Sequence, residues 1–316
     1  MKGDLRLLNI YKTIENHVKP ISQYEPGCWI SLINPNEQEI SYLVEELHID
    51  QDFVRAALDE EESSRIETEE GQTLVIVDAP IAEKQEEGTL LYSTMPFGII
   101  VAEKEKCFIT VSLRTNSVVS EISDGLVKNV QTNLKTQFLL IMLLRISARF
   151  LQYLKQIDKA SSYMEKQLHK SLKNQDLIQL LGLEKSLVYF STALKANDTT
   201  MEKIQRGRII KLYEEDQDLL DDVLIETKQA IEMCSIYSSI LSGTRDAFAS
   251  IISNNLNIVM KVLTTLTIVM SIPTMVFSFY GMNTNLPYPY FWFPLAIALI
   301  ASGLVVFVLI KKGMFH

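Results

Sequence analysis

The sequence predicts an α+β membrane protein in which an α/β domain is followed by long helices and two transmembrane helices. All 39 acidic residues lie at or before Asp246. The stretch Val262–Ile310 contains no Asp, Glu, Lys, Arg or His, and it is long enough for two spans of ~20 residues each. No proline occurs between Thr200 and Pro273, so the chain there can form one long helix. The expected domains are residues 1–131, 132–256 and 257–316.

Residues 1–131 are expected to form a layered cytoplasmic α/β domain, because short β-like runs alternate with short helices. Asn34-Pro35-Asn36 is typical of a helix start, and it precedes an amphipathic run from Glu37 to Leu47. A second helix is expected at Asp52–Asp59. The expected strands are Leu5–Tyr11, Cys28–Ile33, Thr73–Val77, Phe97–Val101 and Cys107–Leu113.

Residues 132–256 are expected to form long cytoplasmic helices, the second of which ends near Asn197. Thr199 and Glu202 have the spacing of a capping box, which predicts that a stalk helix begins there and runs to Tyr280. Apolar positions on this helix recur in steps of three, four or seven, which is typical of a bundle or coiled-coil seam, so we expect the helix to pack against copies of itself. These seam positions are Leu220, Val223, Ala230, Cys234, Tyr237 and Leu241.

Residues 257–316 are expected to form a transmembrane hairpin, with spans at Val262–Tyr280 and Phe291–Ile310. Lysines flank both ends of the hairpin, at Lys261 and at Lys311 and Lys312. Because Lys and Arg accumulate on the cytoplasmic side, both chain termini are expected in the cytoplasm. The chain is therefore predicted to be a multi-pass protein of the plasma membrane, in contact with lipid.

A narrow polar stripe follows the first span and the helix before it, in steps of three and four residues. Small polar residues on a transmembrane helix often serve only helix packing. This stripe is unusual because it continues upstream to the last carboxylate of the chain, so we prefer lining of a water-filled pore. Its members are Asp246, Ser250, Ser253, Asn257, Met260, Thr264, Thr267, Ser271, Thr274 and Ser278.

Composition argues against several other functions. The formal net charge of −9 does not suit binding of nucleic acid, which needs a basic face. The three cysteines form no CxxC pair and the four histidines are scattered, so no zinc cluster is indicated. Because we find no nucleophile–base pair and no phosphate-binding loop, we expect neither an enzyme nor an organic cofactor.

The segment Tyr280-Gly281-Met282-Asn283, at the outer end of the first span, is similar to the signature of the CorA family of two-span magnesium transporters. Met260-Lys261-Val262-Leu263 at the inner boundary adds to the resemblance, which extends over nearly the whole chain. The resemblance implies a homopentameric funnel that admits divalent cations, above all Mg²⁺, with the long helix of each subunit lining the pore.

The resemblance also assigns residues to parts of the pore. It places Asn283 in an outer selectivity ring, with Gly281 and Met282 at the same filter. It places Asp246 near the lower end of the pore, and it prefers Leu263 as a lining residue where the polar stripe prefers Thr264. The remaining lining positions that it implies are Asn257, Ser271, Thr274 and Ser278.

Regulatory metal sites between subunits are a further implication of the resemblance. Asp222 on the long helix matches one bridging carboxylate. Its partner would fall near Ala56, which has no carboxylate, so Asp59, Glu60 or Glu61 could substitute. The outer loop Thr284–Phe293 lacks the family's usual glutamate, which leaves the preferred ion open. A zinc, cobalt or nickel transporter of the same superfamily is one alternative, and a membrane-anchored coiled-coil scaffold is another.

Overall fold

The computed structural model describes residues 8–84, 90–170, 174–207, 210, 212–282, 290 and 292–314. The chain divides into two compact units, Met1–Gly243 and Thr244–His316. The predicted filter residue Asn283 and most of the loop that follows it lie outside the described residues.

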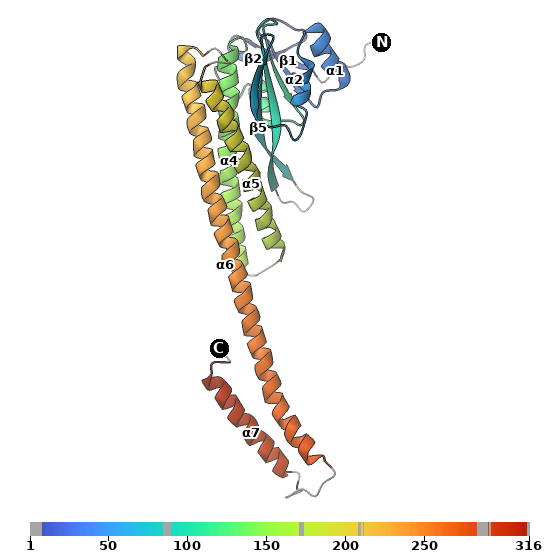
Figure 1. The fold of residues 1–316 in the computed structure, drawn as a ribbon, viewed down its shortest axis with the longest axis vertical. Helices are drawn as coiled ribbons and strands as arrows, with labels where there is room; N and C mark the ends of the chain where they lie inside the picture. Colours follow the sequence, from blue (N-terminus) through green and yellow to red (C-terminus); the bar gives the residue numbers. More distant parts are fainter. Residues whose placement is uncertain are drawn as a thin grey trace. The chain divides into compact units, whose positions relative to one another are not determined.

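The first unit is built on a β-sheet (Figure 1). Within the described residues this sheet has seven strands in the order β2-β1-β3-β7-β6-β5-β4. Only the β3–β7 pair among these strands is parallel. Four predicted strands are confirmed as β3, β5, β6 and β7, whereas β2 and β4 were not predicted. The predicted strand Leu5–Tyr11 overlaps β1 in part, and its first three residues lie outside the described residues. The strands are β1 (Asn9–Ile14), β2 (His17–Ile21), β3 (Trp29–Ile33), β4 (Arg65–Glu69), β5 (Gln72–Lys84), β6 (Leu90–Ala102) and β7 (Cys107–Ser112).

Helices cover both faces of this sheet, because alternate side chains of a strand point to opposite faces. On β5, Leu74 and Ile76 join the core beneath α1, η1 and α2, whereas Val75 and Val77 join the core beneath α4 and α5. The helices are α1 (Glu37–Ser41), η1 (Tyr42–Glu46, a π-helical turn), α2 (Gln51–Ala56), α3 (Ser117–Ser123), α4 (Lys135–Lys170) and α5 (Asn174–Gln205).

The two predicted short helices are confirmed, and polar caps explain where they begin. Asn36 and Glu39 form a capping box at the start of α1, in which each side chain accepts from the other residue's backbone N–H. The Asp50 carboxylate accepts from the Asp52 N–H at the start of α2. The predicted run from Glu37 to Leu47 corresponds to α1 followed by η1.

The prediction of a helix start at Thr199 is wrong. Thr199 lies inside α5, where its hydroxyl donates to the Lys195 carbonyl at 3.0 Å instead of capping a new helix. The helix ends at Gln205, and Gly207 follows with a φ of 67°. A left-handed glycine just past the last turn is a common helix stop. The long helix, α6 (Glu214–Tyr280), therefore begins later than predicted.

The predicted self-packing seam of α6 is also wrong. Val223, Ala230 and Cys234 are buried in the same chain's core, together with residues of α4 and α5. The Thr227 hydroxyl lies 2.8 Å from that of Ser147 on α4, and the Cys234 thiol donates to the Leu187 carbonyl on α5 at 3.2 Å. The spacing of the apolar residues correctly predicted a buried face of α6, but α4 and α5 of the same chain cover this face.

A buried amide joins α5 to the sheet. Asn197, which is 1% exposed, accepts from the Asp78 N–H and donates to the Asp78 carbonyl, both at 2.8 Å. The Ser64 hydroxyl lies 2.9 Å from the Asn197 amide oxygen and 3.2 Å from the Asp78 carboxylate. Burial raises the pKa of the Asp78 carboxyl above its ordinary value, although the Ser64 hydrogen bond acts in the opposite direction.

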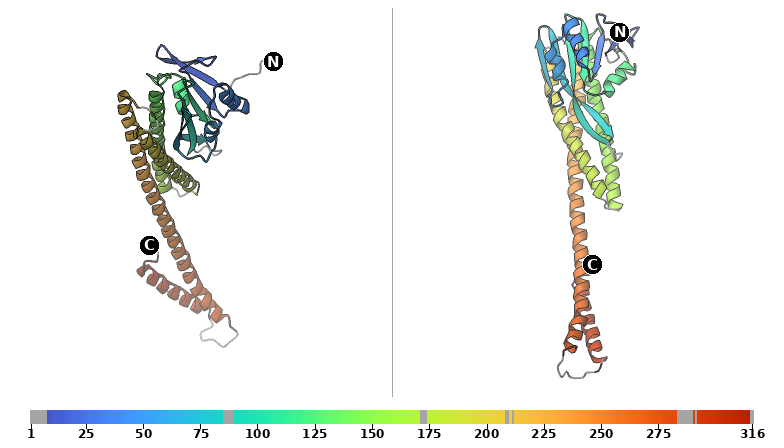
Figure 2. Two further views of the ribbon diagram at one scale, coloured as in Figure 1. Left: turned by 45° about the horizontal axis from the view of Figure 1, so that its top comes forward. Right: turned by 90° about the vertical axis from the view of Figure 1, so that its right-hand side faces the viewer.

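The second unit holds the C-terminal part of α6 and the helix α7 (Trp292–Lys311), which runs back in the opposite direction (Figure 2). Within the described residues three helices are long and apolar enough to cross a membrane, but the apolar window of α4 is 56% buried inside the chain. The corresponding windows of α6 and α7 are only 6% and 11% buried. These two helices therefore retain the exposed apolar surface that a bilayer requires.

Candidate functional site

The polar stripe lies on the exposed surface of α6. All ten of its members, from Asp246 to Ser278, are exposed in the single chain. Their steps of three and four residues keep them on one side of the helix, as the sequence predicts. Met260 is the one member without a polar side chain, and it is 58% exposed.

The opposite side of α6 packs against α7. Thr265 is 1% exposed, and Val269, Ile272 and Val276 are half-buried, each three or four residues from the next. Residues two apart differ by ~200° around a helix, so Thr265 and Thr267 face away from each other. The polar stripe is therefore not the face that this chain buries against its own second apolar helix.

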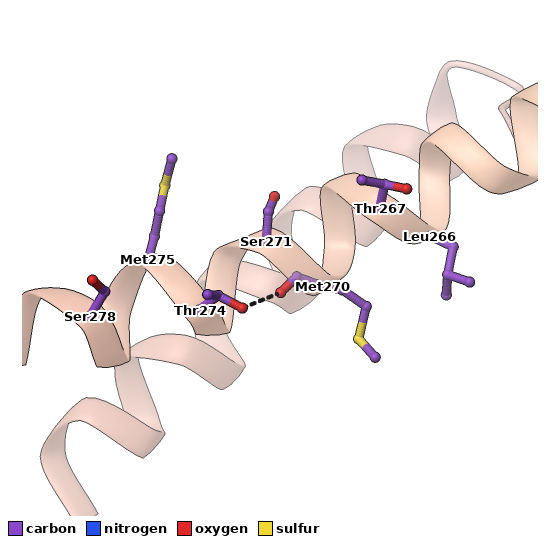
Figure 3. A pocket seen from close by; sticks show the side chains of 7 residues that line it. All are labelled: Leu266, Thr267, Met270, Ser271, Thr274, Met275 and Ser278. Atoms are coloured by element: carbon purple, nitrogen blue, oxygen red, sulfur yellow. Dashed lines mark hydrogen bonds between the residues drawn. The ribbon is translucent and has the colours of Figure 1, made fainter.

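The part of the stripe from Thr267 to Ser278 lines an open groove of about 640 Å³ (Figure 3). Polar side chains lie along the groove, and apolar ones extend on both sides of it, as Met275 and Met270 show in Figure 3. The lining residues are Leu266, Thr267, Met270, Ser271, Thr274, Met275 and Ser278.

Three hydroxyls of the groove donate to the backbone of their own helix. Thr267 donates to the Leu263 carbonyl at 2.8 Å, Ser271 to Ile268 at 2.8 Å and Thr274 to Met270 at 3.0 Å (Figure 3 draws the last). A hydroxyl has one hydrogen to donate, so each oxygen then faces the groove only as an acceptor. Such a surface suits hydrogen-bond donors, including water molecules that a metal cation holds.

Exposed apolar side chains flank the stripe on both sides. Leu266 and Met270 on one flank are 57% and 65% exposed, and Met275 and Phe279 on the other are 73% and 58% exposed. Apolar surface of this extent in a soluble helix would indicate a covering partner. The helix therefore has a polar face, two apolar flanks and a back that packs on α7.

The predicted filter residues Gly281 and Met282 directly follow the C-terminal end of α6. The Gly281 N–H donates to the Phe277 carbonyl at 2.9 Å and that of Met282 to Phe279 at 3.4 Å, so both continue the last turn. The position of Asn283 is not described. Leu263 and Thr264 are both exposed, so the register between them stays a prediction.

The predicted pore residue Asp246 and the predicted regulatory carboxylates Asp222, Asp59 and Glu60 are all exposed, and one chain does not assemble them into a site. Asp246 lies 3.3 Å from the Arg245 guanidinium, and Glu60 lies 3.6 Å from Arg114. The Asp59 carboxylate accepts from the Glu61 N–H, and Asp222 is exposed on α6. Among the described residues, no three His, Cys, Asp or Glu side chains form a group that could hold a metal ion.

Sequence reasoning did not identify the direction in which the groove hydroxyls donate, nor two buried hydroxyls behind the groove. Thr265 Oγ1 on α6 and Ser302 Oγ on α7 are buried and have no hydrogen-bond partner in the described structure. The signal for Thr265 was present, because it is a polar residue off the stripe. Nothing in the sequence marked Ser302.

Comparisons with known proteins agree with this architecture. A family model described as CorA-like Mg²⁺ transporter protein matches residues 25–312. The cobalt/magnesium transport protein CorA of Methanocaldococcus jannaschii is 25% identical over 296 residues, covering 90% of each chain.

Solved structures resemble the fold along the whole chain. The complete structure of the M. jannaschii CorA magnesium transporter superposes with a TM-score of 0.83 at 22% identity, covering 99% of this chain and 100% of that one. Full-length CmaX gives 0.71 at 13% identity, covering 99% of both chains. The cytoplasmic domain of ZntB from Vibrio parahaemolyticus gives 0.60 at 9% identity, covering 78% of this chain and 99% of that one. At these identities the likeness concerns the fold alone.

Proposed function

The chain belongs to the CorA-like Mg²⁺ transporter family, and from this premise we propose that its copies surround a water-filled pore through which Mg²⁺ enters the cytoplasm. The family membership makes it a transporter of divalent cations. The pore, its lining and the direction of flux are the proposal. The observation that carries it is the polar stripe of α6, which is exposed on the side of the helix opposite α7.

The four sides of α6 support a ring of subunits. A polar face turned to a central axis would be wetted, and the two apolar flanks would each meet the flank of a neighbouring copy. The α7 helix would then lie outside, toward lipid. A heterologous contact between two different flanks forms a ring when its rotation closes, and we propose five copies because the family resemblance implies a pentamer.

The chemistry of the lining suits Mg²⁺ with its water shell. Magnesium loses its waters reluctantly, so a fast pore accepts hydrogen bonds from those waters rather than stripping them. The hydroxyls of Thr267, Ser271 and Thr274 present acceptors for this purpose. At the outer mouth, we propose that the Asn283 amide oxygens and Gly281 carbonyls do the same. A potential of 100 mV supplies ~2.3 kcal/mol per elementary charge, or about twice that for a divalent ion.

We propose the plasma membrane as the location, with both termini in the cytoplasm. The exposed residues Lys261, Lys311 and Lys312 lie at the ends of the apolar segments that would be cytoplasmic. The exposed apolar side chains of α7, such as Leu299 and Phe307, would contact lipid.

Gating by intracellular metal requires two subunits if it operates here, because one chain does not assemble a metal site among its described residues. Asp222 and Asp59 are exposed and therefore available to a neighbour, whereas Glu60 is near Arg114. We expect Asp222→Ala to keep the channel conducting at high internal Mg²⁺. Normal closure of this variant would remove Asp222 from the proposal.

The function is tested by Mg²⁺ uptake into liposomes that hold the purified protein and an imposed inside-negative potential. We expect uptake by the wild type and its loss in Asn283→Ala, with unchanged oligomer size as the control for assembly. Uptake retained by Asn283→Ala would contradict the assigned filter. Parallel assays with Co²⁺, Ni²⁺ and Zn²⁺ separate a magnesium transporter from the alternatives, and no flux of any ion would favour a scaffold.

A further inference from the structure

Pro273 leaves one backbone carbonyl of α6 without its helical donor. In an α-helix the N–H of each residue donates to the carbonyl four residues earlier, and proline has no N–H. Within α6 (Glu214–Tyr280), which contains Pro273, the carbonyl so affected is that of Val269. In an apolar surrounding such a carbonyl is costly unless another donor reaches it, and Ser or Thr hydroxyls often serve this purpose.

The hydroxyls of α6 around Pro273 serve the two neighbouring carbonyls instead. Ser271 donates to Ile268, and Thr274 donates to Met270. Both hydroxyls belong to the polar stripe, whereas Val269 is half-buried on the side that packs against α7. The place to look for a donor to the Val269 carbonyl is therefore α7.

Ser302 on α7 is that kind of donor. Its hydroxyl oxygen is buried and has no hydrogen-bond partner in the described structure. One turn earlier, Ala298 is 3% exposed, so two small residues four apart lie on the covered side of α7. Small residues at such spacing let two helix backbones approach closely.

Donor and acceptor also lie at the same height in the hairpin. The rings of Tyr280 and Phe293, whose centroids are 6.3 Å apart, mark the end of the hairpin where the two helices meet. At ~1.5 Å per residue, Ser302 lies roughly 14 Å along α7 from Phe293, and the Val269 carbonyl oxygen lies roughly 15 Å along α6 from Tyr280.

We propose that Ser302 is a positioning residue of the pore, whose hydroxyl donates to the Val269 carbonyl when α7 closes on α6. In the structure the Ser302 hydroxyl has no hydrogen-bond partner, and the bond forms when the two helices approach each other. The bond fixes the back of α6 at the height of Ser271, so it determines how the acceptor groups on the front face the lumen. The effect on transport rests on the proposed function, but the bond itself does not.

The test compares Ser302→Ala with Ser302→Thr in two backgrounds, the wild type and Pro273→Ala. Alanine at position 273 gives the Val269 carbonyl an N–H donor of its own, so Ser302 is then no longer needed. We expect Ser302→Ala to lower Mg²⁺ uptake about threefold, the factor that an average interhelical hydrogen bond corresponds to. We expect Ser302→Thr to keep the wild-type rate, and Ser302→Ala to have no further effect beside Pro273→Ala.

A second readout is the melting temperature of the purified protein, which does not depend on transport. Ser302→Ala should lower it by about 2 °C in the Pro273 background only. Gly303→Ala is the matched control, since a methyl group there meets no atom within 4 Å. Equal effects of Ser302→Ala in both backgrounds, or none in the wild type, would overturn the proposal. If Ser302→Ala lowers the melting temperature only where Pro273 is present, but the protein takes up no Mg²⁺, the hydrogen bond is supported and only the proposed pore is refuted.

Discussion

Thr265 and Thr267 lie two residues apart on α6 and face opposite surroundings. Thr265 is 1% exposed against α7, whereas Thr267 is exposed and donates to the Leu263 carbonyl at 2.8 Å. One residue type thus occupies both the back and the polar face of the same helix. Substitutions at these two positions can therefore distinguish a role in helix packing from a role in transport.

Replacing the threonines of the polar face should impair transport. In Thr267→Val with Thr274→Val, the shape is kept but two acceptors of each subunit are lost, at ~1 kcal/mol per hydrogen bond. We expect Mg²⁺ uptake to fall by about tenfold or more. The control is Thr265→Val, which removes a buried hydroxyl without a described partner and should leave uptake unchanged. A larger loss in Thr265→Val than in the double variant would mean that packing, not wetting, explains the stripe.

The packing of α2 on the sheet predicts the effect of Gly98→Ala. A Cβ atom at Gly98 on β6 would overlap the Cβ atom of Ala57, at the end of α2. Backbone has to move to relieve such a contact, so we expect a loss of about 1–3 kcal/mol in the free energy of unfolding. Urea unfolding of the purified protein measures it.

Gly243→Ala provides the contrast for that variant. Gly243 lies within α6, and an added Cβ meets no atom within 4 Å. Alanine favours a helix over glycine by about 1 kcal/mol, so this variant should be as stable as the wild type or more so. If both glycine variants destabilised the protein equally, the difference in packing between the two positions would be refuted.

Asp78 predicts a pH dependence of stability. Burial raises the pKa of its carboxyl in the folded chain, so the folded state holds the proton more tightly than the unfolded state. The contribution of the Asp78 carboxyl to the free energy of unfolding is fully present below the pKa that this group has in the unfolded chain. It is lost as the pH rises through the pKa that the group has in the folded chain. Asp78→Asn never ionises, and its amide can donate to Ser64. We expect the melting temperature of Asp78→Asn minus that of the wild type to grow as the pH rises above the ordinary pKa of an Asp carboxyl. A difference independent of pH would contradict the raised pKa.

The sequence predicted the apolar helices and the polar stripe because both depend on local patterns. The absence of charge between Val262 and Ile310 marks membrane-compatible helices, and the steps of three and four fix a common face. The spacing of the stripe residues does not predict whether α7 packs on the polar face of α6 or on the opposite face. That fact needed the burial of Thr265 and of Ala298.

The α5–α6 boundary shows where local patterns were insufficient. Thr199 and Glu202 have the spacing of a capping box, but Asn197 and Thr200 are each 1% exposed inside the core. Burial of that turn favours continuing α5 through it, so tertiary packing overrides the cap. The prediction that Val223 and Cys234 pack against copies of α6 was wrong for a different reason. Periodicity identifies a buried face but not the element that covers it.

The most direct measurement of the central claim is labelling of single cysteines on α6 by a membrane-impermeant, water-soluble thiol reagent. The native cysteines are buried, and burial raises the pKa of Cys107 to about 12 and that of Cys234 to about 11, so background labelling should be low. We predict that Thr267→Cys and Thr274→Cys react and that the reaction blocks Mg²⁺ uptake, whereas Ile272→Cys on the α7 side does not react. Failure of both stripe cysteines to react, with Mg²⁺ present or removed, would contradict a water-filled pore along this face.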